Sequence, residues 1–247
     1  MEHPFLRCEM LWGEEAQQRL ARSHVILFGL GGVGSYVAES LARAGIGELT
    51  LVDNDTVALT NLNRQLEALH STLGKTKAQA VAERLLDINP DLQLHPMCAT
   101  YDAAHRDLFF PQGCRYDYIV DAIDLVSCKI DLAETARRLD IPLIMALGTG
   151  NKLDPSLLRV ADLSETYGCP LARVMRKELR KRGMEHVQVV FSPEEGVTPA
   201  QPEAPPPGRR SVPGSTPWVP AAAGLLIGSA VVRGLIHRQS DSKEKEM

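Results

Sequence analysis

The chain has 247 residues, of which 44% are hydrophobic and 23% charged, and this balance is typical of a globular protein with a sizeable core. A formal net charge of -4 excludes a uniformly basic nucleic-acid coat but leaves room for a local basic patch. The five cysteines contain no C-x-x-C pair, which argues against a disulfide framework and against a cysteine-based zinc site.

The N-terminal residues do not resemble an export signal. The first ten, MEHPFLRCEM, have neither a positive n-region nor an apolar h-region, so we expect a cytoplasmic protein. The longest apolar tract, 218–236, contains Pro220, Ser229 and Arg233, and these residues favour a packed terminal helix over a membrane span. No membrane partner is expected.

Hydrophobic periodicity predicts a leading arm and helix over 1–23, in which Leu11, Ala16 and Leu20 are available to pack. Strands that alternate with helices follow. The predicted strands are 25–28, 48–52, 92–95, 116–120, 142–146, 157–161 and 187–191. The predicted helices are 35–44, 78–88, 102–109, 127–139, 170–182 and 220–238. This alternation predicts an α/β fold with a doubly wound, Rossmann-like and mostly parallel sheet.

The predicted elements suggest one domain over 1–247. Residues 24–162 would form its nucleotide-binding core, and 163–240 the part that binds a substrate or partner. This second part contains a basic helix, a Pro-rich segment over 192–217 that we expect to be a mobile loop, and the terminal helix.

Four glycines, Gly29, Gly31, Gly32 and Gly34, follow the first predicted strand and lead directly into a helix. Glycines permit a tight turn and a close approach of the backbone to a phosphate, and the start of the helix offers free N–H groups to an anion. Strand, glycine turn and helix together predict a phosphate-bearing ligand here.

Acidic residues lie at the ends of two further predicted strands. Asp53 ends the second strand, where a carboxylate is placed to accept both hydroxyls of a ribose. Asp121 and Asp124 follow the strand 116–120. Because the carboxyl ends of parallel strands meet at one edge of the sheet, we expect these residues and the glycine turn to border one crevice.

The polar residues between these strands favour ATP over a dinucleotide. A dinucleotide dehydrogenase would explain the glycines and Asp53, but it gives no reason for Asn61, Arg64 and Lys77 at the same edge. Nucleotidyl transfer from ATP needs cations on the α-phosphate and the departing pyrophosphate, and a carboxylate for Mg²⁺. Arg64 and Lys77 can supply the cations, and Asp124 the carboxylate.

The same residues carry a family resemblance over about residues 5–240. The chain resembles the E1-like adenylating enzymes of the ThiF, MoeB and HesA group in five motifs: GLGGVGS at 29–35, DND at 53–55, NLNRQ at 61–65, GKTK at 74–77 and VDAID at 120–124. This resemblance implies an ATP-binding enzyme that forms an acyl-adenylate, typically as a homodimer. Arg7 lies where the family often brings an arginine across the dimer interface.

Roles follow from the resemblance, position by position. The four glycines look like the phosphate loop, and Asp53 looks like the ribose acceptor. Asn61, Arg64 and Lys77 look like triphosphate ligands, and Asp124 like the aspartate that binds Mg²⁺. The resemblance therefore makes Arg64, Lys77 and Asp124 the candidate catalytic residues.

Two features select a branch of this family. The activators of sulfur-carrier and ubiquitin-like proteins usually carry a C-x-x-C zinc pair, which this sequence lacks, so no zinc is expected. Instead, NKLDP at 151–155 and CPLARVMRKELRKRG at 169–183 look like the tRNA threonylcarbamoyladenosine (t6A) dehydratase branch. That resemblance implies ATP-dependent cyclisation of the threonylcarbamoyl group, giving ct6A, on an adenosine beside the anticodon of a tRNA.

Adenylation would turn the oxygen of the t6A carboxylate into a good leaving group, after which the neighbouring carbamoyl group can close the ring intramolecularly. Some members of the branch carry a cysteine shortly before the terminal helix. Here that region reads GSTPWVPAAAG, so a thioester route through that position is unavailable.

The predicted helix 170–182 has six basic residues and one acidic residue, Glu178. Leu171, Met175 and Leu179 share one side of it, so the helix is amphipathic. A basic face can simply be solvated, or it can bind an anionic partner such as the phosphates of tRNA. The candidate tRNA-binding residues are Arg173, Arg176, Lys177, Arg180 and Lys181.

Two alternatives remain open. An enzyme that activates the C-terminus of a ubiquitin-like or sulfur-carrier protein would have that carrier, or a sulfur-transfer protein, as its partner, and its pyrophosphate exchange would depend on the carrier. An NAD-linked oxidoreductase or a nucleotide-sensing module would keep its nucleotide affinity in the variants Arg64→Ala and Lys77→Ala.

Overall fold

The computed structural model describes residues 3–200 and 212–237. Within them, seven strands form one sheet in the order β3-β2-β1-β4-β5-β7-β6. The strands are β1 (His24–Phe28), β2 (Glu48–Val52), β3 (Gln93–Met97), β4 (Tyr118–Asp121), β5 (Leu143–Ala146), β6 (Arg159–Asp162) and β7 (Gln188–Phe191). All neighbours pair in parallel except β6, which runs antiparallel to β7. The predicted α/β fold with a mostly parallel sheet is confirmed.

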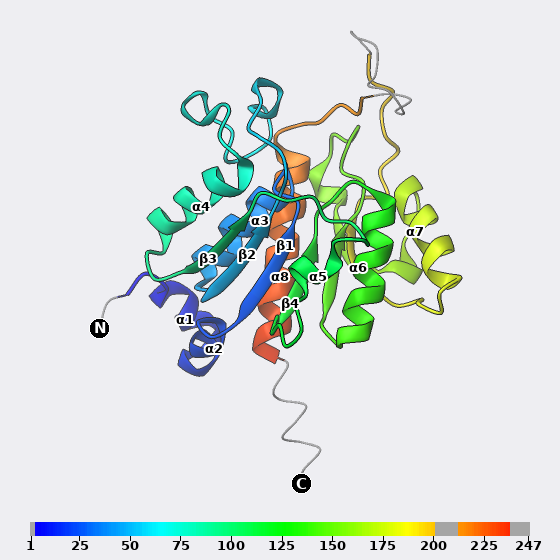
Figure 1. Ribbon diagram of the computed structural model, residues 1–247. Helices are drawn as coiled ribbons and strands as arrows, with labels where there is room; N and C mark the ends of the chain where they lie inside the picture. The colour runs from blue at the N-terminus through cyan, green and yellow to red at the C-terminus, as the bar shows by residue number, and fades with distance from the viewer. Residues whose placement is uncertain (1–2, 201–211, 238–247) are drawn as a thin grey trace.

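Helices cover both faces of this sheet (Figure 1). The longer ones are α3 (Gly34–Ala44), α4 (Lys77–Ile88), α6 (Val126–Leu139), α7 (Pro170–Arg180) and α8 (Trp218–His237). Each begins and ends within two residues of its predicted bounds. Helices α3, α4 and α8 share one apolar cluster with Val25 and Leu27 of β1, whereas α6 packs with Ile26 and Phe28 on the opposite face. Because side chains alternate along β1, this strand contributes to the apolar core on both faces of the sheet.

The N-terminal region differs from its prediction. Instead of one helix, 1–23 contains α1 (Leu6–Trp12) and α2 (Glu14–Leu20), which are separated at Gly13, where φ is +84°. Leu20 is fully buried, but Leu11, which we expected to pack, is 83% exposed. No residue of α1 is buried.

The predicted helix 102–109 is also shorter in the structure, where α5 spans only Arg106–Phe109. The carboxylate of Asp102 accepts the backbone N–H groups of Ala104 and His105, each at 2.9 Å. This local turn competes with helix formation, as short aspartate side chains commonly do.

By length and composition, α8 alone among the helices of the described residues could cross a membrane, and 56% of its most apolar window is buried inside the fold. It packs most extensively against α3, where Gly224 approaches the backbone of Val33 so closely that an added Cβ would lie 2.4 Å from its carbonyl oxygen. These contacts are those of a core helix, as the sequence predicted.

Most of the predicted loop 192–217 is described, although its centre, 201–211, lies outside the described residues. Both described ends of the loop attach to Asn151, which has φ +61°. The backbone of Asn151 donates to the carbonyl oxygen of Gly214 and accepts from the N–H of Val197, each at 2.8 Å, while its side chain accepts the N–H of Gly214 at 2.7 Å. One residue therefore holds the two ends of this loop together.

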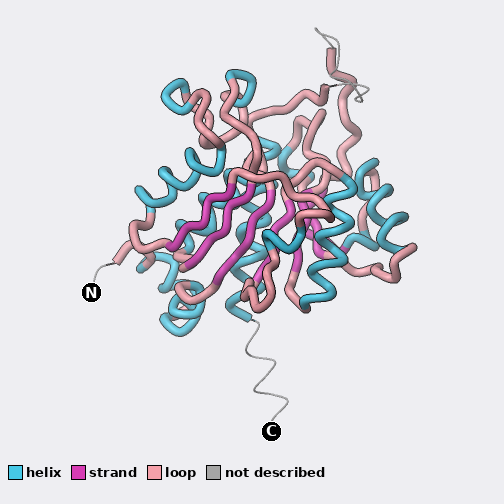
Figure 2. The backbone as a smooth tube through the Cα atoms, in the orientation of Figure 1, coloured by secondary structure: helices cyan, strands magenta, loops and turns pink. Residues whose placement is uncertain are grey.

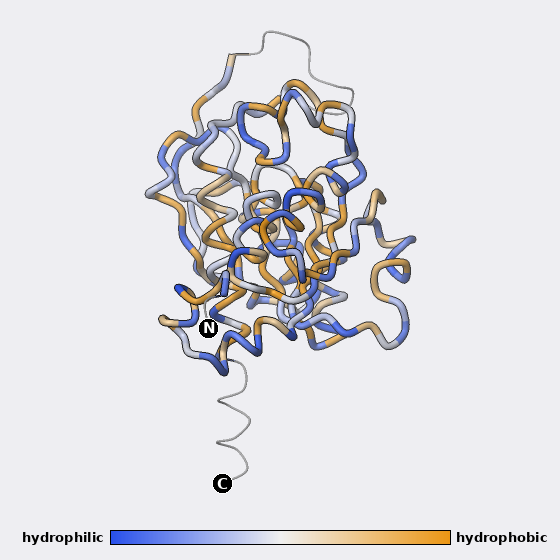
Figure 3. Tube along the Cα trace, turned by 90° about the vertical axis from the view of Figure 1, so that its left-hand side faces the viewer, coloured by the Kyte–Doolittle hydropathy of each residue, from blue (hydrophilic) through white to orange (hydrophobic). Residues whose placement is uncertain are grey.

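The loops that follow β1, β2, β4 and β5 lie along one edge of the sheet, at the top of Figure 2. Viewed from the side, hydrophobic segments concentrate along the strands inside, and hydrophilic segments are frequent in the peripheral loops (Figure 3). The residues expected to border the crevice follow these strands and lie at this loop-bearing edge, whereas α1 and α2 lie at the opposite edge (Figure 1).

Candidate functional site

The glycine turn lies between β1 and α3. Gly29 has φ +87°, and a Cβ there would lie 2.7 Å from the carbonyl oxygen of Ala122. A Cβ on Gly34 would lie 1.8 Å from the carbonyl oxygen of Gly29. Neither position accommodates a side chain, so bare backbone reaches the edge at which α3 begins. This is the local geometry that a phosphate-binding turn requires.

Asp53 directly follows β2, and its carboxylate is bonded to the glycine turn. Its Oδ2 accepts the N–H of Leu30 at 2.7 Å, and its Oδ1 accepts the N–H of Asp55 at 2.8 Å. A carboxylate has about four lone-pair sites, so Asp53 retains acceptor capacity for the hydroxyls of a ribose. The structure thus places Asp53 and the glycine turn side by side.

The segment between β2 and α4 passes next to this turn. Asn61 accepts a backbone N–H within its own turn through Oδ1, at 2.9 Å. The guanidinium of Arg64 donates to Oδ1 of Asn63, also at 2.9 Å. A Cβ on Gly32 would lie 3.3 Å from Cγ of Arg64, so this side chain runs directly against the glycine turn. Arg64 therefore borders the glycine turn, and Asn61 is joined to it through the backbone, because the carbonyl oxygen of Asn61 accepts the N–H of Arg64 at 3.0 Å.

Lys77 is the first residue of α4, and its side chain is only 6% exposed. Its ammonium donates to Oδ2 of Asp55 at 2.7 Å, and its backbone N–H donates to the carbonyl oxygen of Asp55 at 2.9 Å. These two contacts with Asp55, which follows β2, hold the buried ammonium of Lys77 at this edge of the sheet. An ammonium has three donors, so Lys77 can bind a phosphate oxygen as well.

The two aspartates after β4 have different environments. Asp121 is fully buried, and its Oδ2 lies 3.1 Å from Nζ of Lys129, which also donates to the carbonyl oxygen of Ala146 at 2.7 Å. Burial raises the pKa of Asp121, and the nearby Lys129 opposes that rise. Asp124 is exposed in the turn before α6. Only Asp124 is therefore accessible to a ligand, whereas Asp121 joins β4 to α6.

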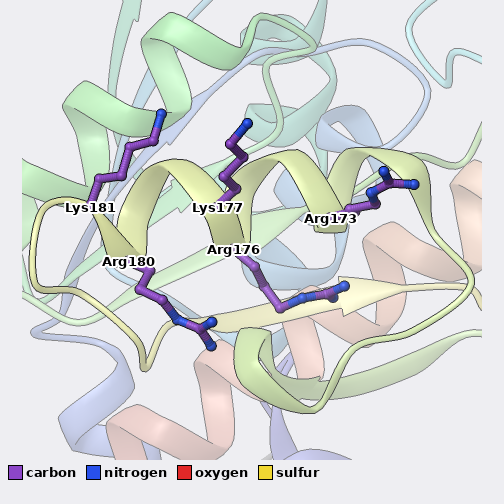
Figure 4. A pocket seen from close by; sticks show the side chains of 5 residues that line it. All are labelled: Arg173, Arg176, Lys177, Arg180 and Lys181. Carbon is purple, nitrogen blue, oxygen red and sulfur yellow. The ribbon is translucent and has the colours of Figure 1, made fainter.

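The basic helix α7 buries Ala172, Met175 and Leu179, while Leu171 is only partly buried. Its five candidate cations line one broad face, but they extend towards different borders of it. Lys177 and Lys181 extend from one side, and Arg176 and Arg180 from the other (Figure 4). The helix geometry separates these pairs because neighbouring positions do not face each other.

The cations of α7 also differ in their contacts. Arg176 donates to the backbone oxygen and the hydroxyl of Thr166, Arg180 lies 3.5 Å from Glu185, and Lys181 lies 2.7 Å from Glu178. Arg173 and Lys177 are exposed, and neither forms an ion pair with a residue in the described ranges.

The helix α7 begins near the crevice. Its first turn lies beside Gly148, which follows β5, since a Cβ on Gly148 would be 4.0 Å from both Sγ of Cys169 and Cβ of Leu171. Arg173 is therefore the cation of α7 nearest the carboxyl edge of the sheet. All five candidate cations border a surface depression of about 410 Å³.

Residues 6–246 match the ThiF family. The chain belongs to the ThiF family. It is 40% identical over 245 residues to a tRNA threonylcarbamoyladenosine dehydratase of Bacillus subtilis, with 96% of each protein covered. It is 40% identical over 197 residues to the enzyme of that name from Escherichia coli, covering 76% of this chain and 73% of that one. The crystal structure of the E. coli dehydratase in complex with ATP superposes with a TM-score of 0.85, at 34% identity and 96% coverage of both chains.

One predicted residue lies away from the crevice of this ThiF-family chain. Arg7 is exposed on α1, which packs with α2 at the amino edge of the sheet. Phe5 and Gln17 from this region lie next to Gly45, just before β2 begins. The structure therefore does not bring Arg7 to the nucleotide site of its own chain.

Two further residues border the crevice, and the sequence motifs did not indicate them. Gln65 lies next to Gly31, and its buried Oε1 has no hydrogen-bond partner among the described residues. Glu67 is only 2% exposed, and in the described part of the chain neither of its carboxyl oxygens has a hydrogen-bond partner. Burial raises the pKa of Glu67 to about 7, Lys77 opposes the rise and Asp53 adds to it.

The sequence contains a weak signal for these two residues. Gln65 ends the NLNRQ motif and Glu67 follows it by two positions, but a glutamate in a polar segment is usually solvated. Their burial depends on the way the segment folds against α3, where the N–H of Leu66 donates to Oγ of Ser35 at 3.2 Å. That contact cannot be inferred from spacing alone.

Proposed function

We propose that the protein is an ATP-dependent tRNA threonylcarbamoyladenosine dehydratase, which adenylates the t6A carboxylate and cyclises it to ct6A. The observation that carries this proposal is the gathering of a glycine turn, Asp53, Arg64, Lys77 and Asp124 at one edge of the sheet. The similarity to named dehydratases over 96% of the chain supports the same reaction.

In this proposal each part of the crevice has a defined task. The triphosphate contacts the glycine turn, Asn61, Arg64 and Lys77, and the ribose contacts Asp53. Arg64 and Lys77 stabilise the negative charge that develops as pyrophosphate leaves the α-phosphate. The glycines of the turn are Gly29, Gly31, Gly32 and Gly34.

Mg²⁺ fits the residues present. It is usually bound by one or two carboxylates together with substrate phosphates. Asp124 offers an exposed carboxylate in the turn after β4, whereas Asp121 is fully buried. The ion would supply charge neutralisation at the phosphates, and Asp124 would be its protein ligand.

We assign the tRNA backbone to α7. Arg173 and Lys177 have no ion pair with the described residues, and Arg173 lies nearest the crevice, so these two would contact phosphates flanking the modified adenosine. Arg176, Arg180 and Lys181 would contribute a more diffuse positive potential because each already has an intramolecular partner.

We further propose that the chain works as one domain and as a homodimer in the cytoplasm. Residues 24–162 would bind ATP and 163–240 would bind the tRNA. The exposed apolar residues Met10 and Leu11 on α1 support a partner surface there, being 71% and 83% exposed. Arg7 would then reach the nucleotide site of the second subunit.

The test is conversion of t6A-containing tRNA in the presence of ATP and Mg²⁺, read as the loss of one water by mass spectrometry of the nucleoside. Arg64→Ala and Lys77→Ala should each lower kcat/KM about 10²–10³-fold, the size of effect seen when one charge-stabilising group is removed. Lys75→Ala is the matched control, because Lys75 pairs with Glu83 on the exposed surface.

Other outcomes would favour the alternatives. AMP formation that requires a ubiquitin-like or sulfur-carrier protein instead of tRNA would indicate a carrier-activating enzyme. Unchanged ATP affinity and activity in both variants would indicate that Arg64 and Lys77 do not bind the triphosphate.

A further inference from the structure

Three residues that can bind a metal meet at the amino edge of the sheet, away from the nucleotide crevice. His24 and Glu48 are register partners at the starts of β1 and β2, and His95 on β3 is the register partner of Thr50. Because Thr50 lies two positions after Glu48, all three side chains project from the same face of the sheet. Adjacent strands therefore fix their relative positions.

Their potential ligand atoms are already close together. Oε1 of Glu48 lies 3.3 Å from Nδ1 of His24 and 2.7 Å from Nε2 of His95, and all three ligand atoms lie within 4.8 Å of one another. Around a tetrahedral Zn²⁺ with bonds of about 2.0–2.2 Å, ligand atoms are separated by about 3.4 Å. The His24–Glu48 pair meets this spacing at 3.3 Å, and the 2.7 Å separation of His95 from Glu48 would have to lengthen by about 0.7 Å.

His95 can make that movement more easily than the other two ligands. Its side chain is 50% exposed, and β3 is an edge strand of the sheet. The side chains of His24 and Glu48 are 17% and 33% exposed, so they form the fixed part of the cluster. The exposed side of His95 leaves access for a water molecule as a fourth ligand.

The surroundings of His24 orient its ring towards Glu48. Its Nε2 lies 2.9 Å from the hydroxyl of Thr50, which can hold the ring so that Nδ1 faces Glu48. The ring packs edge-on against Tyr116 with a centroid separation of 4.6 Å.

The charges around the cluster also favour binding of a cation. Within the described residues, the ion pairs of Glu48 are with the two histidines, so no lysine or arginine competes for its carboxylate. Two imidazoles and one carboxylate suit Zn²⁺, whereas Mg²⁺ prefers an all-oxygen set. This donor set differs from the cysteine pair that the sequence lacks.

We propose that His24, Glu48 and His95 form a Zn²⁺-binding site that joins β1, β2 and β3 at the amino edge of the sheet. Its fourth ligand is water. The site is separate from the Mg²⁺–ATP crevice, and binding of Zn²⁺ here holds three strands together irrespective of the reaction at the other edge.

The experiment uses the full-length, untagged chain after treatment with a chelator. Isothermal titration with ZnCl₂ is expected to show one tight equivalent, and the melting temperature should rise by several degrees. His95→Ala and Glu48→Gln should each weaken this binding at least tenfold. His95→Ala is expected to fold because His95 is half exposed on an edge strand.

The matched control is His186→Ala, which removes a histidine from an exposed His–carboxylate pair, His186 with Asp162 at 3.4 Å. This variant should bind Zn²⁺ like the wild type, and MgCl₂ should give no comparable isotherm at the site. Equal Zn²⁺ affinity in the wild type, His95→Ala and Glu48→Gln, or loss of binding in His186→Ala alone, would overturn the proposal. Because the readout is metal binding, it does not depend on dehydratase activity.

Discussion

Glu67 shows how a single side chain can mark a ligand site. A buried carboxyl group normally has hydrogen-bond partners, because removing a polar group from water without compensation costs about 1–3 kcal/mol. Among the described residues, Glu67 has none, and the unpartnered Oε1 of Gln65 belongs to the same segment. Three of the four buried side-chain atoms without partners in the described ranges therefore belong to residues that border the crevice. Such atoms are expected where a ligand or its water completes the bonding.

The pKa of Glu67 leads to a pH-dependent prediction. Its pKa is raised to about 7 in the folded chain from an ordinary value of 4.5, so between these values the folded state holds a proton that the unfolded state has released. Stability should therefore fall as the pH rises from 4.5 through 7, by up to about 3 kcal/mol. Glu67→Gln removes this titration and should be more stable than the wild type at pH 8 but nearly equal at pH 4.5.

Urea unfolding at the two pH values measures this difference, in the absence of nucleotide. Glu165→Gln is the control because Glu165 is exposed, and its substitution should have the same small effect at both values. A Glu67→Gln effect that is equal at pH 4.5 and pH 8 would contradict the assignment of a buried, protonated carboxyl group.

At the scale of single residues, the sequence located the candidate ligands that belong to motifs but not the residues that they contact. Asp53 and Lys77 could be located because a strand end and a helix start fix them. The contact between Lys77 and Asp55, and the burial of Glu67, depend on how the segment 56–76 folds. No periodicity describes such a segment, so its contacts were not predictable.

Among the helices, α7 is the one that we propose to contact the tRNA. Charge reversal in Arg173→Glu/Lys177→Glu should weaken tRNA binding and lower the slope of log K against log salt by about 1 for each phosphate that the helix no longer neutralises. ATP affinity should be unchanged, because these side chains do not border the glycine turn. The measurement is the affinity for fluorescently labelled tRNA at salt concentrations between about 50 and 200 mM, a range in which such effects are large.

Lys181→Glu serves as the control for this helix. Lys181 lies at the end of α7 and already contacts Glu178, so its reversal should have a smaller effect than that of the double variant. An unchanged salt slope in the double variant would exclude α7 from the tRNA surface.

Helical periodicity predicted the bounds of long elements well and those of short ones poorly. The helix α6 repeats its apolar pattern over several turns, and tertiary packing agrees with it. By contrast, α5 is only four residues long because the side chain of Asp102 bonds the preceding turn. The apolar pattern also suggested that Leu11 packs, whereas α1 has no buried residue. Periodicity gives the apolar side of a helix but not what covers it.

For the whole molecule, α1 offers a test of the proposed dimer. Leu11→Glu places a charge on a residue that is 83% exposed, so the fold should tolerate it while association of two copies should be abolished. Sedimentation velocity should show a dimer for the wild type and a monomer for this variant. Leu108→Glu, at a residue that is 57% exposed on α5, should remain dimeric.

A mixing experiment tests the role of Arg7 across the interface. Arg7→Ala and Lys77→Ala are each expected to have strongly reduced activity alone, but a heterodimer contains one nucleotide site with both residues intact. Activity of the mixture above that of either variant is the expected result. No recovery, despite exchange of subunits, would show that Arg7 does not serve the second subunit's site.

The anchoring of residues 197 and 214 on Asn151 has a consequence for how this fold can diversify. Since both ends are held by one backbone position, the number of residues between them is decoupled from the rest of the architecture. Doubling the length of a loop whose ends are held together raises the free-energy cost of closing it by only about 0.6 kcal/mol. Evolution can therefore lengthen or shorten this span, or change its composition, without altering the sheet and the helices around it.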